Sequence, residues 1–324
     1  MSSNPLLSAV VIHWRDEEHL THLLGGWPRD PRWELIVVDN SHAEEDHPGL
    51  DLDITGDPSV RILTPDHNLG FAGGANAGIA ASSAPWVLIL NPDAFPHPRA
   101  LEALCTAMDT HPDADGLVPA LEGDDGAPQC QWQLQPLPSA TTLLLQTLFL
   151  AGARGPQDEP SPGTPIEQPA AAALALRRTA LDAIGGFDES FYPAWFEDVD
   201  LARRLARTGH RLLYVPSARF THAMGGSVPS LGYGPFLWVY YRNLCLYLAL
   251  HHGSLWPRIA RITIALGMAL RLALLPLRKP QRAASRSEAA RGLWAVLTGA
   301  LGGFRRPRAW REHFRPRPSE GLHG

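Results

Sequence analysis

Short runs of apolar residues alternate with amphipathic or small-residue segments over the first hundred positions. Four runs are rich in Val, Ile and Leu and have the length of buried strands: 7–14, 33–41, 60–65 and 84–94. Segment 16–27 is acidic in its first turn and closes on two glycines, and segment 73–82 consists of small residues, so each predicts a helix. The alternation predicts an α/β domain with a mostly parallel sheet and helices on both faces.

The pattern is less regular in the middle of the chain. Residues 154–169 are rich in proline and predict a loop. Residues 197–209 have an amphipathic pattern that ends in glycine, which predicts a helix, and residues 210–216 predict a short strand after it. There is no internal repeat, so we expect one domain here rather than an array.

The last part of the chain is apolar and basic. Residues 236–252 predict one apolar helix and residues 258–279 a second, which Arg261 and Arg271 interrupt. The longest charge-free stretch of the second helix is nine residues, far fewer than the roughly 20 that a membrane span needs. The pattern fits an interfacial helix with its basic face toward lipid headgroups, and it equally fits a helix packed on the main domain.

Composition and charge narrow the setting. With 45% hydrophobic and 19% charged residues the chain can form a real core, and its three cysteines have no CxxC spacing, which fits a reducing cytoplasm. The first 14 residues lack the pattern of a signal peptide. Residues 251–324 hold 14 of the 28 Lys and Arg residues and three acids, a formal charge of +11 against −16 for the first 250 residues. We expect this basic part to meet an anionic surface, membrane phospholipid rather than nucleic acid, because its arginines alternate with long apolar runs.

Polar residues follow two of the predicted strands. Asp39, Asn40 and Ser41 end one strand, and Asn91 and Asp93 end another. Ligands bind at the carboxyl ends of strands in open α/β sheets, which predicts a site here. Asp93 by itself could form a turn or could bind a divalent cation.

Residues 68–79, NLGFAGGANAGI, are rich in glycine. They match neither the GxGxxG of a dinucleotide fold nor the GK[ST] of a P-loop. The segment could be a tight turn into a closely packed helix, or a loop whose glycines let the backbone approach a nucleotide.

Three acids, Glu197, Asp198 and Asp200, follow an aromatic run. They could match the dipole at a helix start, or they could include a general base in a partly dry pocket. His222 lies between a short strand and glycines, and is of interest if an acid joins it on a metal.

The order of these segments resembles family 2 glycosyltransferases of the GT-A fold, most of all the branch of rhamnosyltransferases and related cell-wall enzymes. The resemblance rests on VVDNS, NLGFAGGANAGI, LILNPDA and the long segment GGFDESFYPAWFEDVDLARRLARTGHRLLYVPSARFTHAMGGS, and covers about residues 7 to 228. It implies a GT-A catalytic domain over 1–228 and a C-terminal helical, basic extension over 229–324 that is suited to membrane contact.

The resemblance also implies roles for individual residues. Asp198 matches the catalytic base, with Glu197 and Asp200 as supporting neighbours. Asp93 and His222 match ligands of a divalent metal, Mg²⁺ or Mn²⁺, although NPD stands where the family has DxD, so the first acid is missing. The residues that match nucleotide-sugar contacts are His13, Arg15, Asp39, Ser41, Asn68, Gly70, Asn76, Asn91, Asp93 and Trp195.

The expected function is that of an inverting hexosyltransferase in cell-wall or surface-polysaccharide synthesis. The favoured donor is dTDP-rhamnose, the acceptor a glycan or a lipid-linked molecule, and the location the inner, cytoplasmic face of the membrane. The alternative is a catalytically silent nucleotide-sugar-binding or scaffold protein, which only the NPD sequence favours. Arg242 and Asn243 could contact the diphosphate or acceptor, or could be a buried polar pair.

Overall fold

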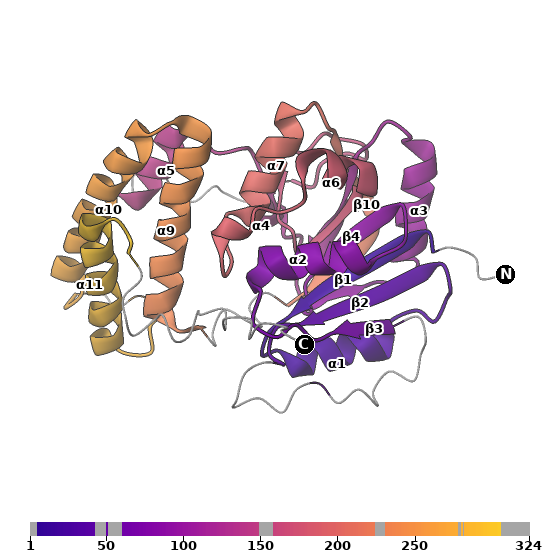
Figure 1. Ribbon diagram of the computed structural model, residues 1–324, viewed down its shortest axis with the longest axis horizontal. Helices are drawn as coiled ribbons and strands as arrows, with labels where there is room; N and C mark the ends of the chain where they lie inside the picture. Colours follow the sequence, from indigo (N-terminus) through magenta and orange to yellow (C-terminus); the bar gives the residue numbers. More distant parts are fainter. Residues whose placement is uncertain are drawn as a thin grey trace, which may run out of the picture.

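The computed structural model describes residues 5–42, 50, 60–148, 158–223, 231–277, 280 and 282–305. The chain forms an α/β body and, beside it, a group of helices that we call the helical body (Figure 1). The helical body consists of α5 (Ala140–Thr147), α9 (Tyr233–His252), α10 (Leu255–Leu274) and α11 (Arg286–Gly302). In the α/β body the helices are α1 (Glu17–Gly26), α2 (Gly70–Ala81), α3 (Ala100–Thr110), α4 (Cys130–Gln133), α6 (Arg178–Ile184), the 3-10 turn η2 (Glu189–Phe191) and α7 (Glu197–Arg207).

An eight-stranded sheet forms the centre of the α/β body in the described residues, in the order β3-β2-β1-β4-β9-β6-β10-β5. Its strands are β1 (Leu7–His13), β2 (Trp33–Asp39), β3 (Val60–Leu63), β4 (Trp86–Leu90), β5 (Ala94–Pro96), β6 (Gly116–Glu122), β9 (Ala173–Arg177) and β10 (Leu212–His222). The strands from β3 to β4 are parallel, as are β6 and β10, whereas β9 and β5 run antiparallel to their neighbours. A small pair, β7 (Leu134–Gln135) and β8 (Gln168–Pro169), lies outside it. The predicted mostly parallel α/β fold is confirmed.

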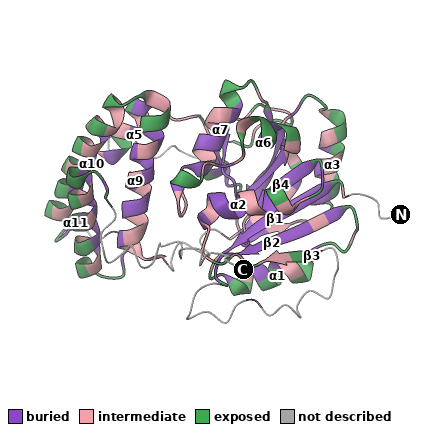
Figure 2. Ribbon diagram, viewed as in Figure 1, coloured by how far each residue is buried: buried purple, intermediate pink, exposed green. Residues whose placement is uncertain are grey.

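Helices bury both faces of this sheet (Figure 2). Side chains alternate along each strand, so in β1 Ala9 and Val11 face the cluster that contains Leu20 of α1 and Leu104 of α3. Val10 and Ile12 face the opposite cluster, to which α2, α6 and α7 contribute. Strands β1, β2 and β4 are therefore apolar on both sides along their middle residues, which is the pattern that the sequence predicted.

The predicted elements differ from the observed ones mainly at their ends. The predicted strand 84–94 stops at Leu90, because the backbone N–H of Ala94 bonds the carbonyl of Asn91 and turns the chain before β5 begins. The predicted helix 73–82 already begins at Gly70, and the predicted strand 210–216 continues to His222 as β10. Each extension brings a predicted site residue onto a regular element.

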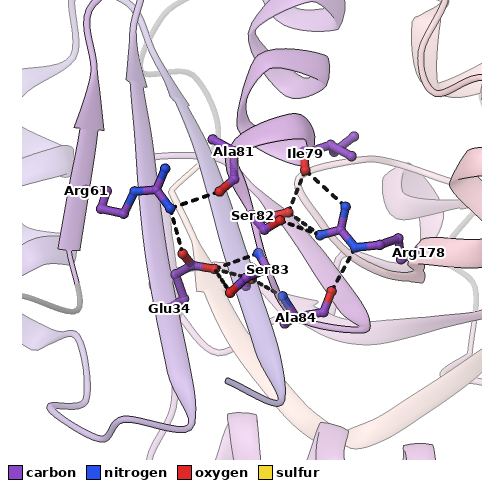
Figure 3. A network of polar contacts seen from close by, with 9 residues as sticks. Glu34, Arg61, Ile79, Ala81, Ser82, Ser83, Ala84 and Arg178 are labelled. Carbon is purple, nitrogen blue, oxygen red and sulfur yellow. Dashed lines mark hydrogen bonds and ion pairs between the residues drawn. The ribbon is translucent and has the colours of Figure 1, made fainter. Parts of the chain in front are cut away.

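Arg178, the first residue of α6, bonds the C-terminal end of α2 and the residues that follow it (Figure 3). Its guanidinium donates to the carbonyls of Ile79 at 3.2 Å, Ser82 at 3.0 Å and Ala84 at 3.0 Å. Carbonyls at the end of a helix have no partner within the helix, so this arginine satisfies them in place of solvent. The contact fixes the end of α2 that lies away from Gly70, where the helix begins.

The loop before α7 enters the core of the helical body. Phe191 and Phe196 belong to the same buried cluster as Leu143 of α5 and Tyr247 of α9. Because α5 comes from within residues 1–228, the helical body is not built from the C-terminal segment alone, and the predicted boundary at 228 lies outside the described residues. Among the helices that are described, none has the length and hydropathy needed to cross a bilayer.

Candidate active site

Asp93 and His222 lie together at the end of the sheet, although 129 positions separate them in the chain. Asp93 precedes β5, and β5 pairs antiparallel with the last residues of β10, so that His222 stands opposite Ala94. Nε2 of His222 is 3.4 Å from Oδ1 of Asp93, and both side chains are buried. Two of the sequence-predicted residues are therefore neighbours.

Gln129 determines which ring nitrogen of His222 faces Asp93. The amide nitrogen of Gln129 donates to the carbonyl of His222 at 2.7 Å, so its oxygen, 2.9 Å from Nδ1, must accept a hydrogen from Nδ1. Trp132 stacks on the imidazole with ring centroids 5.0 Å apart. Nδ1 therefore carries hydrogen, and Nε2 points at the Asp93 carboxylate.

Asp93 and His222 are two side chains that could hold a cation. In the neutral ring, the lone pair of Nε2 and a carboxylate oxygen repel each other unless a cation lies between them. A histidine whose other nitrogen is held by a hydrogen bond is the usual form of a metal-ligating imidazole. In the described part of the chain, no group of three or more His, Cys, Asp or Glu side chains could hold a metal ion. The remaining ligands would have to be substrate phosphates and water, as is common for Mg²⁺.

The ends of β1 and β2 form a second buried polar cluster. His13 and Asp39 stand side by side in register, and Nδ1 of His13 is 3.0 Å from Oδ1 of Asp39. The backbone N–H of Asp16 donates to Nε2 of His13 at 3.1 Å, which leaves Nδ1 as the donor to Asp39. The hydroxyl of Ser41 accepts from the backbone N–H of Arg15 at 2.7 Å. The sequence-predicted residues His13, Arg15, Asp39 and Ser41 thus form one connected group.

Asp39 is held as a carboxylate in this cluster. Burial by itself would raise its pKa, but hydrogen bonds from His13 and from the backbone of Ser41 outweigh burial, so the pKa is lowered. Its second oxygen, Oδ2, is buried and makes no hydrogen bond in the described chain. A buried acceptor of this kind can receive an N–H from a bound ligand.

Residues 68–70 form a turn. They belong to the glycine-rich segment that could be a loop close to a nucleotide. Gly70 has a φ of +69°, and its N–H bonds the side chain of Asn68 at 2.8 Å. Asn40 holds the turn by accepting from the N–H of Leu69 and donating to the carbonyl of Gly70, both at 3.0 Å. The N–H of Phe71 donates to the carbonyl of Pro193 at 2.7 Å, which connects this turn to the loop before Asp198.

Gly70→Ala should destabilise the protein more than Gly185→Ala. Both glycines have left-handed backbones, with φ of +69° and +74°, so each substitution costs about 1–2 kcal/mol of backbone strain. A Cβ on Gly70 would also lie 2.7 Å from the carbonyl oxygen of Pro193, whereas nothing lies within 4 Å of a Cβ on Gly185. Denaturant unfolding of both variants measures the difference, and equal free energies of unfolding would contradict the contact between Gly70 and Pro193.

Asn76, a predicted nucleotide contact, makes hydrogen bonds within the protein. Its amide nitrogen donates to the carbonyl of Phe187 and to the carboxylate of Glu189, both at 2.9 Å, and its oxygen accepts from the N–H of Phe187. Both amide hydrogens are therefore taken, and Asn76 bridges α2 to the turn that precedes η2. Its contact with a nucleotide stays a prediction.

Asp198 is the second residue of α7, and the residue as a whole is half-buried. Burial raises its pKa to about 6, although hydrogen bonds from the backbone of Val199, Asp198 and Ala171 oppose the rise. Ala171 precedes Ala172, whose carbonyl accepts from the N–H of Asn91 at 2.8 Å. A short backbone path therefore joins the Asp198 carboxylate to the turn that carries Asp93.

Glu197 and Asp200 lie beside Asp198 in sequence but differ in their surroundings. Burial, and then the charge of Asp198, raise the pKa of Glu197 well above its usual value. Asp200 pairs with Arg204 at 2.7 Å and with Nε2 of His251 at 2.7 Å, which anchors α7 to the end of α9. The expected support of Asp198 by Asp200 is therefore indirect, through the position of the helix.

Trp195 and Phe196 form a strained, aromatic entry to α7. Their φ angles are +73° and +74°, in the left-handed region that side chains other than glycine rarely adopt. Trp195 packs edge-on against Phe236 of α9, with centroids 4.8 Å apart, and Phe196 lies 5.3 Å from Tyr240. Such strain persists where surrounding contacts impose it, often at functional sites.

Sequence reasoning did not name Gln129 and Trp132 as site residues. Gln129 comes directly before α4 and Trp132 lies in it, in the segment PQCQWQ, which has no motif and no periodicity. Their partner His222 is 93 positions away from Gln129. No local signal in the sequence could have paired them, because the contact depends on how α4 sits beside the end of β10.

Comparison with known proteins shows which family the chain resembles. The family model described as glycosyl transferase family 2 matches residues 18–164. The N-acetylglucosaminyl-diphospho-decaprenol L-rhamnosyltransferase of Mycobacterium tuberculosis is 30% identical over 238 residues, which cover 67% of this chain and 76% of that protein. A pre-mycofactocin glycosyltransferase of the same organism is 30% identical over 196 residues, 58% of this chain and 37% of that protein.

Solved structures support the fold. A mannosyltransferase from Pyrobaculum calidifontis, in complex with GDP-Man and Mn²⁺, aligns over 94% of this chain and 89% of its own with a TM-score of 0.52 and 16% identity. TarS residues 1–349 of S. aureus, in complex with UDP-GlcNAc, aligns over 92% of this chain and 80% of its own, also with a TM-score of 0.52, at 15% identity. The fold is GT-A-like, the protein is a glycosyltransferase, and the chain belongs to glycosyl transferase family 2.

Proposed function

We propose that the protein moves a sugar, with inversion at its anomeric carbon, from a nucleoside diphosphate to a glycan or lipid-linked acceptor. The observation that carries this proposal is the approach of His222 Nε2 to Asp93 at 3.4 Å, at a turn that the 171–172 backbone joins to Asp198. The pair supplies a place for the charge of the leaving group, and Asp198 supplies a base. The two needs of an inverting displacement are thereby met at one end of the sheet.

Asp198 is the proposed base. An acceptor hydroxyl is a poor nucleophile near neutral pH, and a carboxylate within hydrogen-bond reach can take its proton during attack. A pKa of about 6 leaves Asp198 largely ionised at pH 7 while keeping it a stronger base than an exposed aspartate. Burial and the charge of Asp198 raise the pKa of Glu197 well above its usual value, which favours the neutral form of Glu197 beside the Asp198 carboxylate.

Asp93 and His222 are the proposed ligands of a divalent cation, Mg²⁺ or Mn²⁺. Such an ion stabilises negative charge on the diphosphate as the glycosidic bond breaks. Asn91 stands where the family's DxD has its first acid. The protein then supplies one carboxylate and one imidazole to the cation, and phosphate oxygens can complete the coordination shell. Gln129 keeps the imidazole in the orientation that presents Nε2.

The cluster at the ends of β1 and β2 is the proposed site of the nucleotide base and ribose. Asp39 has an ionised carboxylate with one oxygen not hydrogen-bonded in the described chain, which suits an N–H of a pyrimidine. Arg15, Ser41 and the 68–70 turn lie around it. Trp195 is the proposed wall between donor and acceptor.

We propose dTDP-rhamnose as the donor. The support is the relative that is named an L-rhamnosyltransferase. Thermal-shift measurements with nucleoside diphosphates and Mn²⁺ or Mg²⁺ test it. A shift with dTDP that exceeds the shift with UDP or GDP is expected, and a larger shift with either of those would contradict a dTDP donor. Release of nucleoside diphosphate from a panel of nucleotide sugars then distinguishes an enzyme from a silent binding protein.

We also propose that the helical body rests on anionic phospholipid at the cytoplasmic face of the membrane, where a lipid-linked acceptor would be found. The outer side of α10 and its end carry apolar side chains that are 45–81% exposed: Leu255, Ile262, Leu266, Leu270, Leu274 and Leu277. Most of these recur at three, four or seven positions, so they form one stripe along the helix. An exposed apolar stripe of this length is typical of an interaction surface.

Charge favours lipid as the occupant of this stripe. The exposed ions of the described helical body and its connections are arginines: Arg258, Arg282, Arg286, Arg291 and Arg305. The acid within residues 231–305 is Glu288. Its carboxylate accepts hydrogen bonds from the backbone N–H groups of Tyr233 and Ala284, next to the first turns of α9 and α11. The α/β body carries most of the acids, and its charge would orient it away from an anionic bilayer.

The double substitution Leu266→Glu with Leu270→Glu should reduce binding to phosphatidylglycerol vesicles at least tenfold. Each change removes apolar area from the contact and places a negative charge against anionic headgroups. Co-sedimentation measures the bound fraction, and transfer to a water-soluble acceptor should persist. Leu6→Glu makes the same change at a 45% exposed leucine of the α/β body and should not alter binding. Equal vesicle binding by the double variant and the wild type would refute the α10 surface.

A further inference from the structure

Asn243 of α9 makes an unusual set of contacts with the loop before Asp198. It is fully buried, and its amide nitrogen donates to the carbonyls of Phe191 and Ala194 at 2.8 Å and of Trp195 at 3.0 Å. Two amide hydrogens serve three acceptors, so at least one hydrogen is shared. The side chain of one residue therefore gathers the carbonyls of a whole turn.

Arg242 completes this arrangement. Its Nη1 donates to the carbonyl of Ser190 and to the amide oxygen of Asn243, each at 2.6 Å. A guanidinium can only donate, so this contact fixes the oxygen of Asn243 and turns its nitrogen toward the three carbonyls. The alternative amide orientation would set an oxygen against three carbonyl oxygens. The two residues thus act as a unit, which we call the RN clamp.

The clamp bonds the strained part of the backbone that leads into α7. Trp195 and Phe196 both have left-handed φ angles, and Glu197 and Asp198 follow them directly. The same face of α9 supplies Phe236, Tyr240 and Tyr247, which pack on Trp195 and Phe196 from positions one helical turn apart or more. Asn243 lies in the middle of this face and satisfies carbonyls that a buried loop could not leave unpaired.

We propose that Arg242 and Asn243 are positioning residues that hold the 190–196 loop so that Asp198 faces the site beside Asp93 and His222. They act through the loop backbone and do not touch substrate. The inference deepens the proposed function, because it rests on Asp198 being the base, and it makes the helical body a working part of the active site. Release of the clamp lets the left-handed backbone relax, which moves the carboxylate and admits water around it.

Asn243→Ala and Arg242→Ala test this proposal. Steady-state kinetics should show kcat lowered about 100-fold for the first and about tenfold for the second, because a small displacement of a reacting group costs this much. KM for the nucleotide sugar should change much less than kcat, because the proposed base and ribose site lies at the ends of β1 and β2 and Trp195 is the one proposed donor contact in the loop. The acid limb of the pH profile should move below pH 6, because water then solvates the Asp198 carboxylate and lowers its pKa. Arg242→Lys, which keeps one donor, should recover part of kcat.

A second measurement needs no turnover. Hydrogen exchange of the intact protein, followed by mass spectrometry, should show faster exchange in peptides that contain residues 190–199 of Asn243→Ala and unchanged exchange in β1, β2 and β4. Leu248→Ala is the matched control, because Leu248 is equally buried on α9. Leu248→Ala should lower the free energy of unfolding. It should leave the acid limb of the pH profile, and kcat relative to KM, unchanged.

The outcomes separate the clamp from the proposed base. If folded Asn243→Ala and Arg242→Ala keep kcat within threefold and the same acid limb while Asp198→Asn is inactive, the clamp is refuted and the base stands. If Asp198→Asn retains transfer, the base assignment fails whatever the clamp variants do. If Asn243→Ala does not fold, Arg242→Ala, which alters a half-exposed side chain, decides the matter alone.

Discussion

Asp198→Asn should lower kcat for sugar transfer by about 10³-fold, since general-base catalysis contributes on that order. The amide keeps the size and the oxygen that accepts from Val199, so the fold and the donor site should be unchanged. Calorimetry with the nucleotide sugar should therefore give an affinity within about threefold of wild type. Equal loss of transfer and of donor binding would remove Asp198 from the role of base.

The pH dependence gives the same residue a second test. Because burial raises the pKa of Asp198 to about 6, its carboxylate is ionised above that pH and protonated below it. A base must be ionised, so kcat should rise with pH through about 6 and level off above it. In Asp200→Asn, which changes an acid of the same helix that is paired with Arg204 and His251, the limb should remain while the free energy of unfolding falls. A wild-type kcat that is independent of pH between 5 and 7 would count against the assignment.

Asp93→Ala and His222→Ala should each weaken Mn²⁺-dependent binding of nucleoside diphosphate by more than about 100-fold. Each removes one of the two protein ligands, and the loss of even a supporting residue typically costs 10–100-fold in metal affinity. Calorimetry with and without Mn²⁺ measures the effect, and EDTA should bring the wild type to the level of the variants. Activity and binding that EDTA leaves unchanged would exclude the proposed cation.

Gln129→Leu tests the residue that orients the imidazole of His222. The substitution keeps the approximate volume but removes the acceptor of Nδ1–H, so the imidazole is free to turn and the affinity should fall about 10–100-fold. Gln133→Leu is a control in the same segment, because Gln133 is also buried but bonds the backbone of Pro119 and Leu121. It should destabilise the protein without a selective effect on Mn²⁺.

The fold could be predicted from the sequence because its signals are local. The apolar strands and small-residue helix that led to the α/β assignment are runs of four to twelve residues whose periodicity does not depend on distant partners. The errors fall at ends such as Leu90 and Gly70, where turns and hydrogen bonds decide the boundary. The antiparallel strand β9 was not predicted, because its place between β4 and β6 follows from tertiary pairing.

The site could be predicted in part. The order of the motifs predicted Asp93, His222 and Asp198 as site residues, and the structure has Asp93 and His222 in contact. Asn76 and Asn243 show the limit of this reasoning, since a polar side chain in a motif can serve either a ligand or a backbone. Which of these it serves depends on carbonyls 48 to 111 positions away, such as those of Trp195 and Phe187. No pattern of neighbouring residues encodes such distances.

The most direct test of the proposed active site is a crystal structure with Mn²⁺ and a nucleoside diphosphate, using anomalous scattering to locate the metal. We expect one Mn²⁺ at roughly 2.0–2.3 Å from a carboxylate oxygen of Asp93 and from Nε2 of His222, with diphosphate oxygens completing the shell. A nucleotide bound in the α/β body with its Mn²⁺ away from both side chains would contradict it.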